Sequence, residues 1–269
     1  MGRVGSRFSQ LLSQGKKTFI PFFTAFYPSW EKFRQILFAA SEIGADFIEI
    51  GIPYSDPLAD GKTIQYTSLC AFNQGFSYEC FLKNMTGLRD ELKSSLILLS
   101  YFNTVLQRGI KRFGEDMIEL GIDGVIIPDL PYEESLSVNS IFVGQGIDLI
   151  PLVAPTTREE RLKLICSQCR SFVYLVSLTG ITGTRSTLPE GIEEYVKRVR
   201  RMTSLPLCVG FGISNGQQAK SMAEIFDGVI VGSALIDVIK GREQDPDALK
   251  KLISLLAVLR EAVYVNNTA

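Results

Sequence analysis

Short apolar runs alternate along the chain with longer amphipathic stretches. Eight of these runs have the length and the β-branched or aromatic content of buried strands. They cover residues 18–25, 47–51, 96–100, 124–128, 148–153, 172–177, 207–211 and 228–232. Helical periodicity predicts helices at 30–43, 62–73, 78–92, 104–120, 133–143, 158–167, 191–202, 217–224, 233–240 and 247–263. Strands that alternate with helices in this way indicate βαβ units and a parallel sheet.

The number of these units predicts the fold. Eight strand–helix units in a chain of 269 residues are typical of a (β/α)8 TIM barrel of the α/β class. An open doubly wound sheet is the alternative, but it usually contains fewer strands. Before residue 18, Phe8, Leu11 and Leu12 share one helical face, which predicts an extra N-terminal helix that caps the barrel bottom. No Pro/Gly/Ser-rich linker divides the chain, so residues 1–269 are interpreted as a single domain.

Composition excludes several classes of protein. With 46% hydrophobic and 21% charged residues, the chain can bury a proper core. A net charge of −1 argues against a broad nucleic-acid surface, which needs clustered positive charge. The chain has no run of about 18 uncharged apolar residues, so we predict no membrane span. The N-terminus also lacks the apolar core of a signal peptide, so we expect a cytoplasmic location.

The chain contains no histidine. This excludes Ser–His and Cys–His triads as well as histidine metal sites. Acid–base chemistry must therefore come from other side chains, with glutamate and aspartate the leading candidates. Cys166 and Cys169 form a lone CxxC motif. It lacks a second pair of zinc ligands, so we interpret these cysteines as reduced structural thiols and expect no metal site.

Two acidic residues are the candidate catalytic groups. Glu49 interrupts an apolar strand, and an unpaired carboxylate buried there would cost several kcal/mol. Because side chains alternate along a strand, Phe47, Glu49 and Gly51 should face the barrel interior and the intervening isoleucines the outer helices. Asp60 follows in the next loop and could approach Glu49, although it could also act as a helix N-cap before Gly61. Burial should raise the pKa of Glu49 and suit it to proton exchange near neutral pH.

Small residues follow the last three strands and predict a phosphate site. They lie at 177–183, 210–214 and 232–233, where backbone N–H groups and a helix N-terminus could hold an anion. Barrel enzymes often bind a substrate phosphate after strands seven and eight. Four aromatic residues near strand ends could line a slot for a flat apolar ring: Phe22, Tyr101, Tyr174 and Phe211. The predicted substrate therefore joins a planar hydrophobic group to a phosphate.

Taken together, these motifs resemble a known family. The segment IEIGIPYSDPLADGKTIQ at 48–65 is similar to the signature of tryptophan synthase α subunits. Further matches are PFFT at 21–24, IPDLP at 127–131, LVAPT at 152–156, VSLTGITG at 176–183, GFGIS at 210–214 and VGS at 231–233. The resemblance implies a (β/α)8 barrel that cleaves indole-3-glycerol phosphate to indole and glyceraldehyde 3-phosphate. It also implies a β-subunit partner that uses pyridoxal phosphate, an αββα tetramer, and no cofactor in this chain.

The same resemblance implies roles for individual residues. Glu49 would protonate indole C3 and help to remove the glycerol hydroxyl proton, while Asp60 would accept a hydrogen bond from indole N1. Thr182 would belong to a mobile loop that closes over the substrate. The indole slot and the phosphate contacts would come from Phe22, Leu99, Tyr101, Tyr174, Gly183, Gly212, Gly232 and Ser233.

The chain departs from the family pattern at several positions. Phe26 stands where the family usually has glycine in a Thr-x-Gly-x-Pro motif, and Lys62 stands at a position that is often proline. Cys70 replaces a common arginine, and Thr104 replaces a proline. A bulky residue at position 26 could crowd the barrel mouth or alter loop closure. The alternative function is therefore a catalytically weakened α subunit that acts mainly as an allosteric activator of its β partner.

Overall fold

The computed structural model describes residues 2–176, 191–210 and 212–264. Within these ranges the strands are β1 (Thr18–Thr24), β2 (Phe47–Gly51), β3 (Ser95–Leu99), β4 (Gly124–Ile126), β5 (Asp148–Ile150), β6 (Leu152–Val153), β7 (Val173–Val176), β8 (Leu207–Gly210) and β9 (Gly228–Val231). Every pairing between them is parallel. The strand order is β5-β4-β3-β2-β1-β9-β8-β7-β6.

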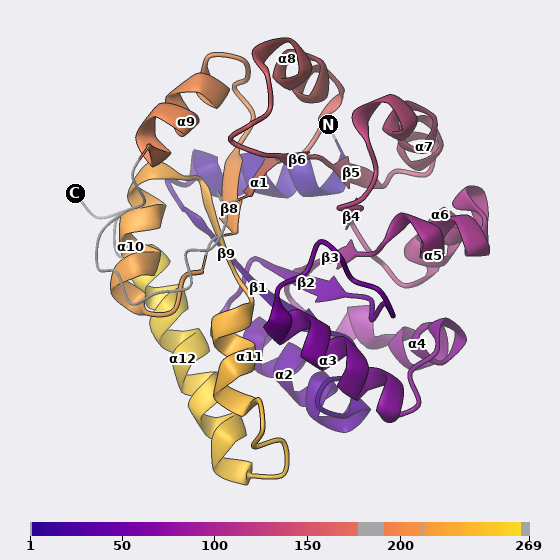
Figure 1. Ribbon diagram of the computed structural model, residues 1–269. Helices are drawn as coiled ribbons and strands as arrows, with labels where there is room; N and C mark the ends of the chain where they lie inside the picture. Colours follow the sequence, from indigo (N-terminus) through magenta and orange to yellow (C-terminus); the bar gives the residue numbers. More distant parts are fainter. Residues whose placement is uncertain (1, 177–190, 211, 265–269) are drawn as a thin grey trace.

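Helices follow the strands around the outside of this sheet (Figure 1). They are α1 (Arg3–Ser13), α2 (Trp30–Ile43), α3 (Lys62–Asn73), α4 (Tyr78–Met85), α5 (Phe102–Arg108), α6 (Ile110–Glu119), α7 (Tyr132–Gly144), α8 (Glu159–Gln168), α9 (Ile192–Arg200), α10 (Gly216–Ile225), α11 (Ser233–Ile239) and α12 (Pro246–Tyr264), with a 3-10 turn at η1 (Leu88–Glu91). Apolar strands buried on both faces are expected where helices cover a parallel sheet. The predicted barrel fold is confirmed.

The two ends of the strand order meet at Pro151. β5 and β6 are consecutive in the chain and only this residue separates them, so the ring closes through a single interrupted strand. Proline has no N–H to donate to a neighbouring strand. The strand predicted at 148–153 is therefore divided into two short ones. Two predicted helices are divided as well, at Gly87 and Gly109, whose φ angles of 80° and 82° do not fit a helix.

The predicted N-terminal helix is confirmed as α1, which crosses one end of the ring (Figure 1). Phe8 is fully buried, and its ring lies 5.0 Å from the rings of both Phe47 and Phe172. The backbone N–H of Val4 donates to Oδ2 of Asp148 at 3.0 Å. α1 thus closes the bottom of the barrel, opposite the end where β2 and its neighbours present their carboxyl-terminal residues. The expectation that residues 1–269 form one domain stays a prediction.

In the part of the chain that the structure describes, the helices are all too short or too polar to cross a membrane.

Candidate active site

Glu49 lies on the inner face of β2. In the parallel register it pairs with Phe22 of β1 on one side and with Ile97 of β3 on the other. Phe47 packs inside the barrel together with Phe8, whereas Ile48 belongs to the cluster beneath the outer helices. The predicted alternation of β2 is therefore confirmed. It brings a carboxylate into the upper layer of an otherwise apolar barrel interior.

The Glu49 carboxyl group is almost completely enclosed. Its residue is 1% exposed, and Oε2 has no hydrogen-bond partner among the described residues. Loss of hydration disfavours the charged form, and the nearby charge of Asp60 disfavours it further, so the pKa of Glu49 rises to about 8. Glu49 is therefore mostly protonated at neutral pH and can donate a proton as well as accept one.

Asp60 lies in the loop between β2 and α3 and is half-buried. The N-cap of α3 is Gly61, so Asp60 does not serve as that cap. Burial raises the pKa of Asp60 to about 6, against a hydrogen bond from the Tyr101 hydroxyl that lowers it. The two neighbouring carboxyl groups thus have unequal pKa values, which suits them to different roles in one reaction.

Tyr101 holds the loop that carries Asp60. The backbone N–H of Ala59 donates to the Tyr101 hydroxyl oxygen at 3.0 Å. The Tyr101 ring also stacks on Tyr54 of the same loop, with ring centroids 4.6 Å apart. Its hydroxyl group contacts Asp60, while the side chain itself is buried behind the loop and does not line the active-site cavity. The structure therefore places Tyr101 next to the site as a support for Asp60.

A cavity of about 580 Å³ opens at the mouth of the barrel, within the size range of small-molecule sites. Several predicted site residues line it together: Phe22, Glu49, Asp60, Leu99, Tyr174, Gly212, Gly232 and Ser233. Thr182, Gly183 and Phe211 lie outside the described residues. Carboxylates from β2 and its loop therefore face strand ends and glycines from the opposite half of the ring.

Gly210 and Ile213, from the predicted phosphate segment at 210–214, also line the cavity. The cavity residues that were not predicted are Gly61, Lys62, Thr63, Ile64 and Ile230. Strand alternation could have identified Ile230, because it lies two residues before Gly232 on the same face. The first turn of α3 carried no comparable signal, since its approach to the cavity depends on the path of the preceding loop.

Glycines leave room for the aromatic side chains of the cavity. A Cβ atom on Gly210 would lie 2.1 Å from the Tyr174 hydroxyl oxygen, and one on Gly232 would lie 3.0 Å from the Phe22 ring. The first distance is far below van der Waals contact. Gly210 is therefore required for the position of the Tyr174 ring, and Gly232 brings the start of α11 close to Phe22.

Phe26 does not crowd the barrel mouth, and the expectation that it could do so is wrong. Its ring packs 5.2 Å from Trp30 and 5.5 Å from Phe76, beneath the helices and away from the cavity-lining residues. Its backbone has a φ of 63°, which costs a non-glycine residue about 1–2 kcal/mol. The departure from the family's glycine thus affects the fold rather than the space available to substrate.

Both cysteines of the CxxC motif are free thiols, with Cys166 buried and Cys169 half-buried. Burial raises the pKa of Cys166 to about 11 and that of Cys169 to about 12, so both are protonated and weakly nucleophilic at neutral pH. Among the described residues, no group of three or more histidine, cysteine or acidic side chains is arranged to hold a metal ion.

The fold and the cavity define a (β/α)8-barrel enzyme with an acid–base site. The family model for the tryptophan synthase alpha chain matches residues 8–263. The tryptophan synthase alpha chain of Thermoanaerobacter pseudethanolicus is 42% identical over 98% of this chain and 100% of its own length. The Synechococcus elongatus protein of the same name is 39% identical, over 98% and 97% of the two chains.

Solved structures agree with these sequence relatives. The alpha subunit from Legionella pneumophila superposes with a TM-score of 0.89 at 32% identity, covering 98% of each chain. A Mycobacterium tuberculosis tryptophan synthase gives a TM-score of 0.88 at 31% identity, again over 98% of each chain. The chain belongs to the tryptophan synthase alpha chain family. Its activity is the lyase reaction of that family, the cleavage of indole-3-glycerol phosphate in tryptophan biosynthesis.

Proposed function

We propose that Glu49 and Asp60 carry out the cleavage of indole-3-glycerol phosphate as a pair with divided roles. The observation that carries this proposal is that both carboxyl groups line one cavity, where burial raises their pKa values unequally. Glu49 has a pKa of about 8 and is mostly protonated at neutral pH, whereas Asp60 has a pKa of about 6 and is mostly ionised. One group is therefore an acid and the other an anion before substrate binds.

The steps follow from these charge states. Glu49 donates its proton to C3 of the indole ring, which places positive charge on the ring nitrogen. The Asp60 carboxylate accepts the hydrogen bond from N1–H and stabilises that charge. Glu49, now ionised, takes the proton of the hydroxyl group on the adjacent side-chain carbon. The carbon–carbon bond to C3 breaks, its electrons restore the indole ring, and the hydroxyl carbon becomes the aldehyde of glyceraldehyde 3-phosphate.

The remaining cavity residues supply binding contacts in this proposal. Phe22, Leu99 and Tyr174 line the side nearest Glu49 and offer apolar surface for the indole ring. Gly212, Gly232 and Ser233 follow β8 and β9, where backbone N–H groups can hold the phosphate. Substrate roles for Thr182, Gly183 and Phe211 stay predictions, because these residues lie outside the described ranges.

We also propose a tryptophan synthase β subunit as partner, in an αββα tetramer, with pyridoxal phosphate in the β subunit and no cofactor in this chain. Membership of the alpha chain family supports the partner. Leu58 beyond β2 and Leu106 in α5 are 84% and 50% exposed near the barrel mouth, and they offer apolar surface to a second protein. The cytoplasmic location stays a prediction.

Indole release from indole-3-glycerol phosphate tests the assignment, measured with and without the β subunit. Glu49→Gln and Asp60→Asn should each lower kcat by about 10²–10⁴-fold, the usual range for a lost acid–base group. Glu224→Gln and Asp90→Asn change two exposed acids and serve as matched controls. Neither substitution should change the rate of indole release. Wild-type rates in both active-site variants would show that other residues transfer the protons. Cleavage near background in the wild type, combined with stimulation of the β subunit, would support the regulatory alternative.

A further inference from the structure

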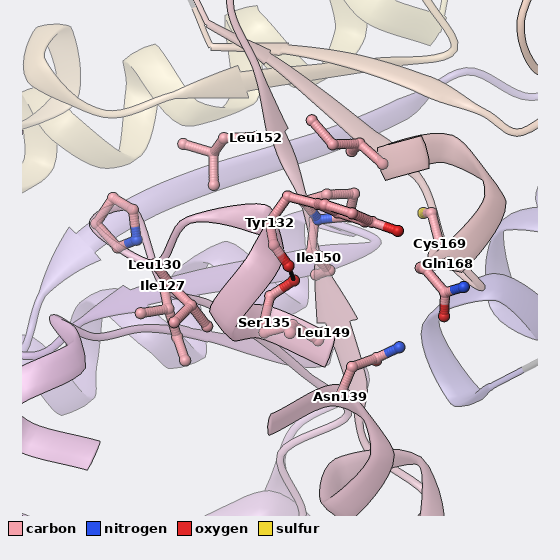
Figure 2. Close-up of a pocket in the computed structure, with 13 residues that line it drawn as sticks. Ile127, Leu130, Tyr132, Ser135, Asn139, Leu149, Ile150, Leu152, Gln168 and Cys169 are labelled. Carbon is pink, nitrogen blue, oxygen red and sulfur yellow. Dashed lines mark hydrogen bonds between the residues drawn. The ribbon is translucent and has the colours of Figure 1, made fainter. Parts of the chain in front are cut away.

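A second cavity lies outside the barrel wall, between α7 and α8 (Figure 2). Among the described residues, none lines both this cavity and the active-site cavity. α7 packs mainly on α6 and β5. A bidentate ion pair connects the first turn of α7 to α8. In this pair Arg161 donates to both carboxylate oxygens of Glu133, at 2.7 and 2.8 Å. The two helices are thus bridged near the barrel mouth while a gap remains between them farther along.

The wall of this cavity combines apolar and neutral polar surface, and none of the described residues that line it carries a formal charge. Leu149 and Leu152, on either side of Pro151 in the sequence, line it from the barrel wall, and Ile165 lines it from α8. The described residues that line it include no lysine, arginine, aspartate or glutamate. An ion placed there would lose hydration without a compensating charge. The cavity therefore favours a neutral occupant.

Polar groups reach the cavity from one face of α7. Tyr132, Ser135 and Asn139 are spaced three and four residues apart, so they lie on the same side of the helix and line the cavity together (Figure 2). Ser135 donates its hydroxyl proton to the Tyr132 carbonyl at 2.7 Å. The half-buried Asn139 amide has no hydrogen bond to any described side chain or backbone group. It can both accept from and donate to a bound molecule.

The size of the cavity limits what it can hold. Its volume is about 110 Å³, on the scale of the ~150 Å³ apolar cavity known to bind benzene. We propose that it is a binding site for a small neutral aromatic molecule with one hydrogen-bonding group. Indole belongs to this class, with a flat apolar ring and a single N–H donor, and the chain's own reaction releases it. Because the lining is separate from Glu49 and Asp60, binding here does not compete with cleavage of the substrate.

Methyl NMR of the full-length chain titrated with indole tests the proposal. Leu149 and Ile165 report on this cavity, and Leu99 and Ile230 report on the active site. We expect saturable shifts of the Leu149 and Ile165 methyl signals. If these signals do not respond up to the solubility limit of indole, the cavity holds only water and the proposal fails. Since Leu99 and Ile230 report independently, that failure is distinguishable from loss of indole binding at the active site.

Two variants separate the apolar and polar parts of the proposal. Ser135→Leu fills the cavity from α7 and should abolish the Ile165 response while leaving that of Leu99. Asn139→Leu removes the amide and should weaken indole binding about two- to tenfold, the range for one lost hydrogen bond. Binding of benzene, which has no hydrogen-bonding group, should not weaken in the same variant. Equal weakening of both molecules would contradict the hydrogen bond to Asn139.

Discussion

Replacing Glu49 with glutamine should remove activity and stabilise the fold at the same time. Glutamine keeps the size of the side chain but carries no charge and cannot transfer a proton. In the wild type, ionisation of Glu49 occurs in an enclosed site where Oε2 has no hydrogen-bond partner among the described residues, and this disfavours the folded state. The unfolded chain has no such penalty, because water solvates the carboxylate there.

The raised pKa sets the size and the sign of this effect. The pKa is about 8 in the folded protein, against an ordinary value of 4.5. Below pH 4.5 the group is neutral in both states and costs nothing. As pH rises towards 8, the unfolded state loses the proton first, so the wild type loses stability through this window. At 1.36 kcal/mol for each pH unit, the difference from 4.5 to 8 corresponds to a full loss of about 5 kcal/mol. Roughly 3 kcal/mol of it should fall between pH 5 and pH 8.

Urea unfolding at pH 5, 6, 7 and 8 measures this loss, with unfolding free energies extrapolated to water. The advantage of Glu49→Gln over the wild type should grow by about 3 kcal/mol from pH 5 to pH 8. Any free-energy cost of fitting the glutamine amide into the site is independent of pH. It therefore cancels when the difference between variant and wild type is compared across pH values. Glu224→Gln, at an exposed position, should show no such growth. A difference between Glu49→Gln and wild type that stays flat or shrinks with pH would refute the reasoning.

Four further predictions concern the contacts of the site and of the barrel floor. The plot of kcat/KM against pH should rise through about pH 6 and fall through about pH 8. The two limbs report the ionisation of the coupled pair formed by Asp60 and Glu49. In Tyr101→Phe the rising limb should move to higher pH, because a hydrogen bond that lowers the pKa of Asp60 is lost; an unmoved limb would contradict that contact. Gly210→Ala should raise KM by displacing the Tyr174 ring, and binding assays that find wild-type affinity would show that the ring is not needed in its present place. Phe8→Ala should cost about 3–5 kcal/mol in urea unfolding, whereas a loss below 1 kcal/mol would mean that α1 does not seal the barrel.

Much of this arrangement was predictable from local pattern alone. The period-2 alternation around Glu49 assigned its side chain to the barrel interior, and the order of strands and helices indicated which end of the barrel carries the site. The lack of lysine or arginine within the predicted strands also indicated that Glu49 would have no internal cation. These inferences depend on backbone geometry that is the same in every strand of this kind.

Other features depend on contacts between distant segments and had no local signal. Tyr101 holds the loop that carries Asp60 through a hydrogen bond from the backbone N–H of Ala59, which is 42 positions away in the sequence. Only the path of the loop brings these residues together. The direction of the Phe26 ring follows from its positive φ, a conformation that the sequence does not favour for phenylalanine. Pro151 was visible in the sequence, but its effect on the barrel wall, and the cavity beside it, required the positions of α7 and α8.

The protonation state of Glu49 is the most direct test of the acid–base account. A ¹³C NMR titration of the glutamate side-chain carboxyl carbons, with Glu49 assigned by comparison with Glu49→Gln, measures it in the folded protein without substrate. The enclosed site predicts a midpoint near pH 8. A midpoint near the ordinary value of 4.5 would contradict the account, because Glu49 would then hold no proton to give to indole at neutral pH.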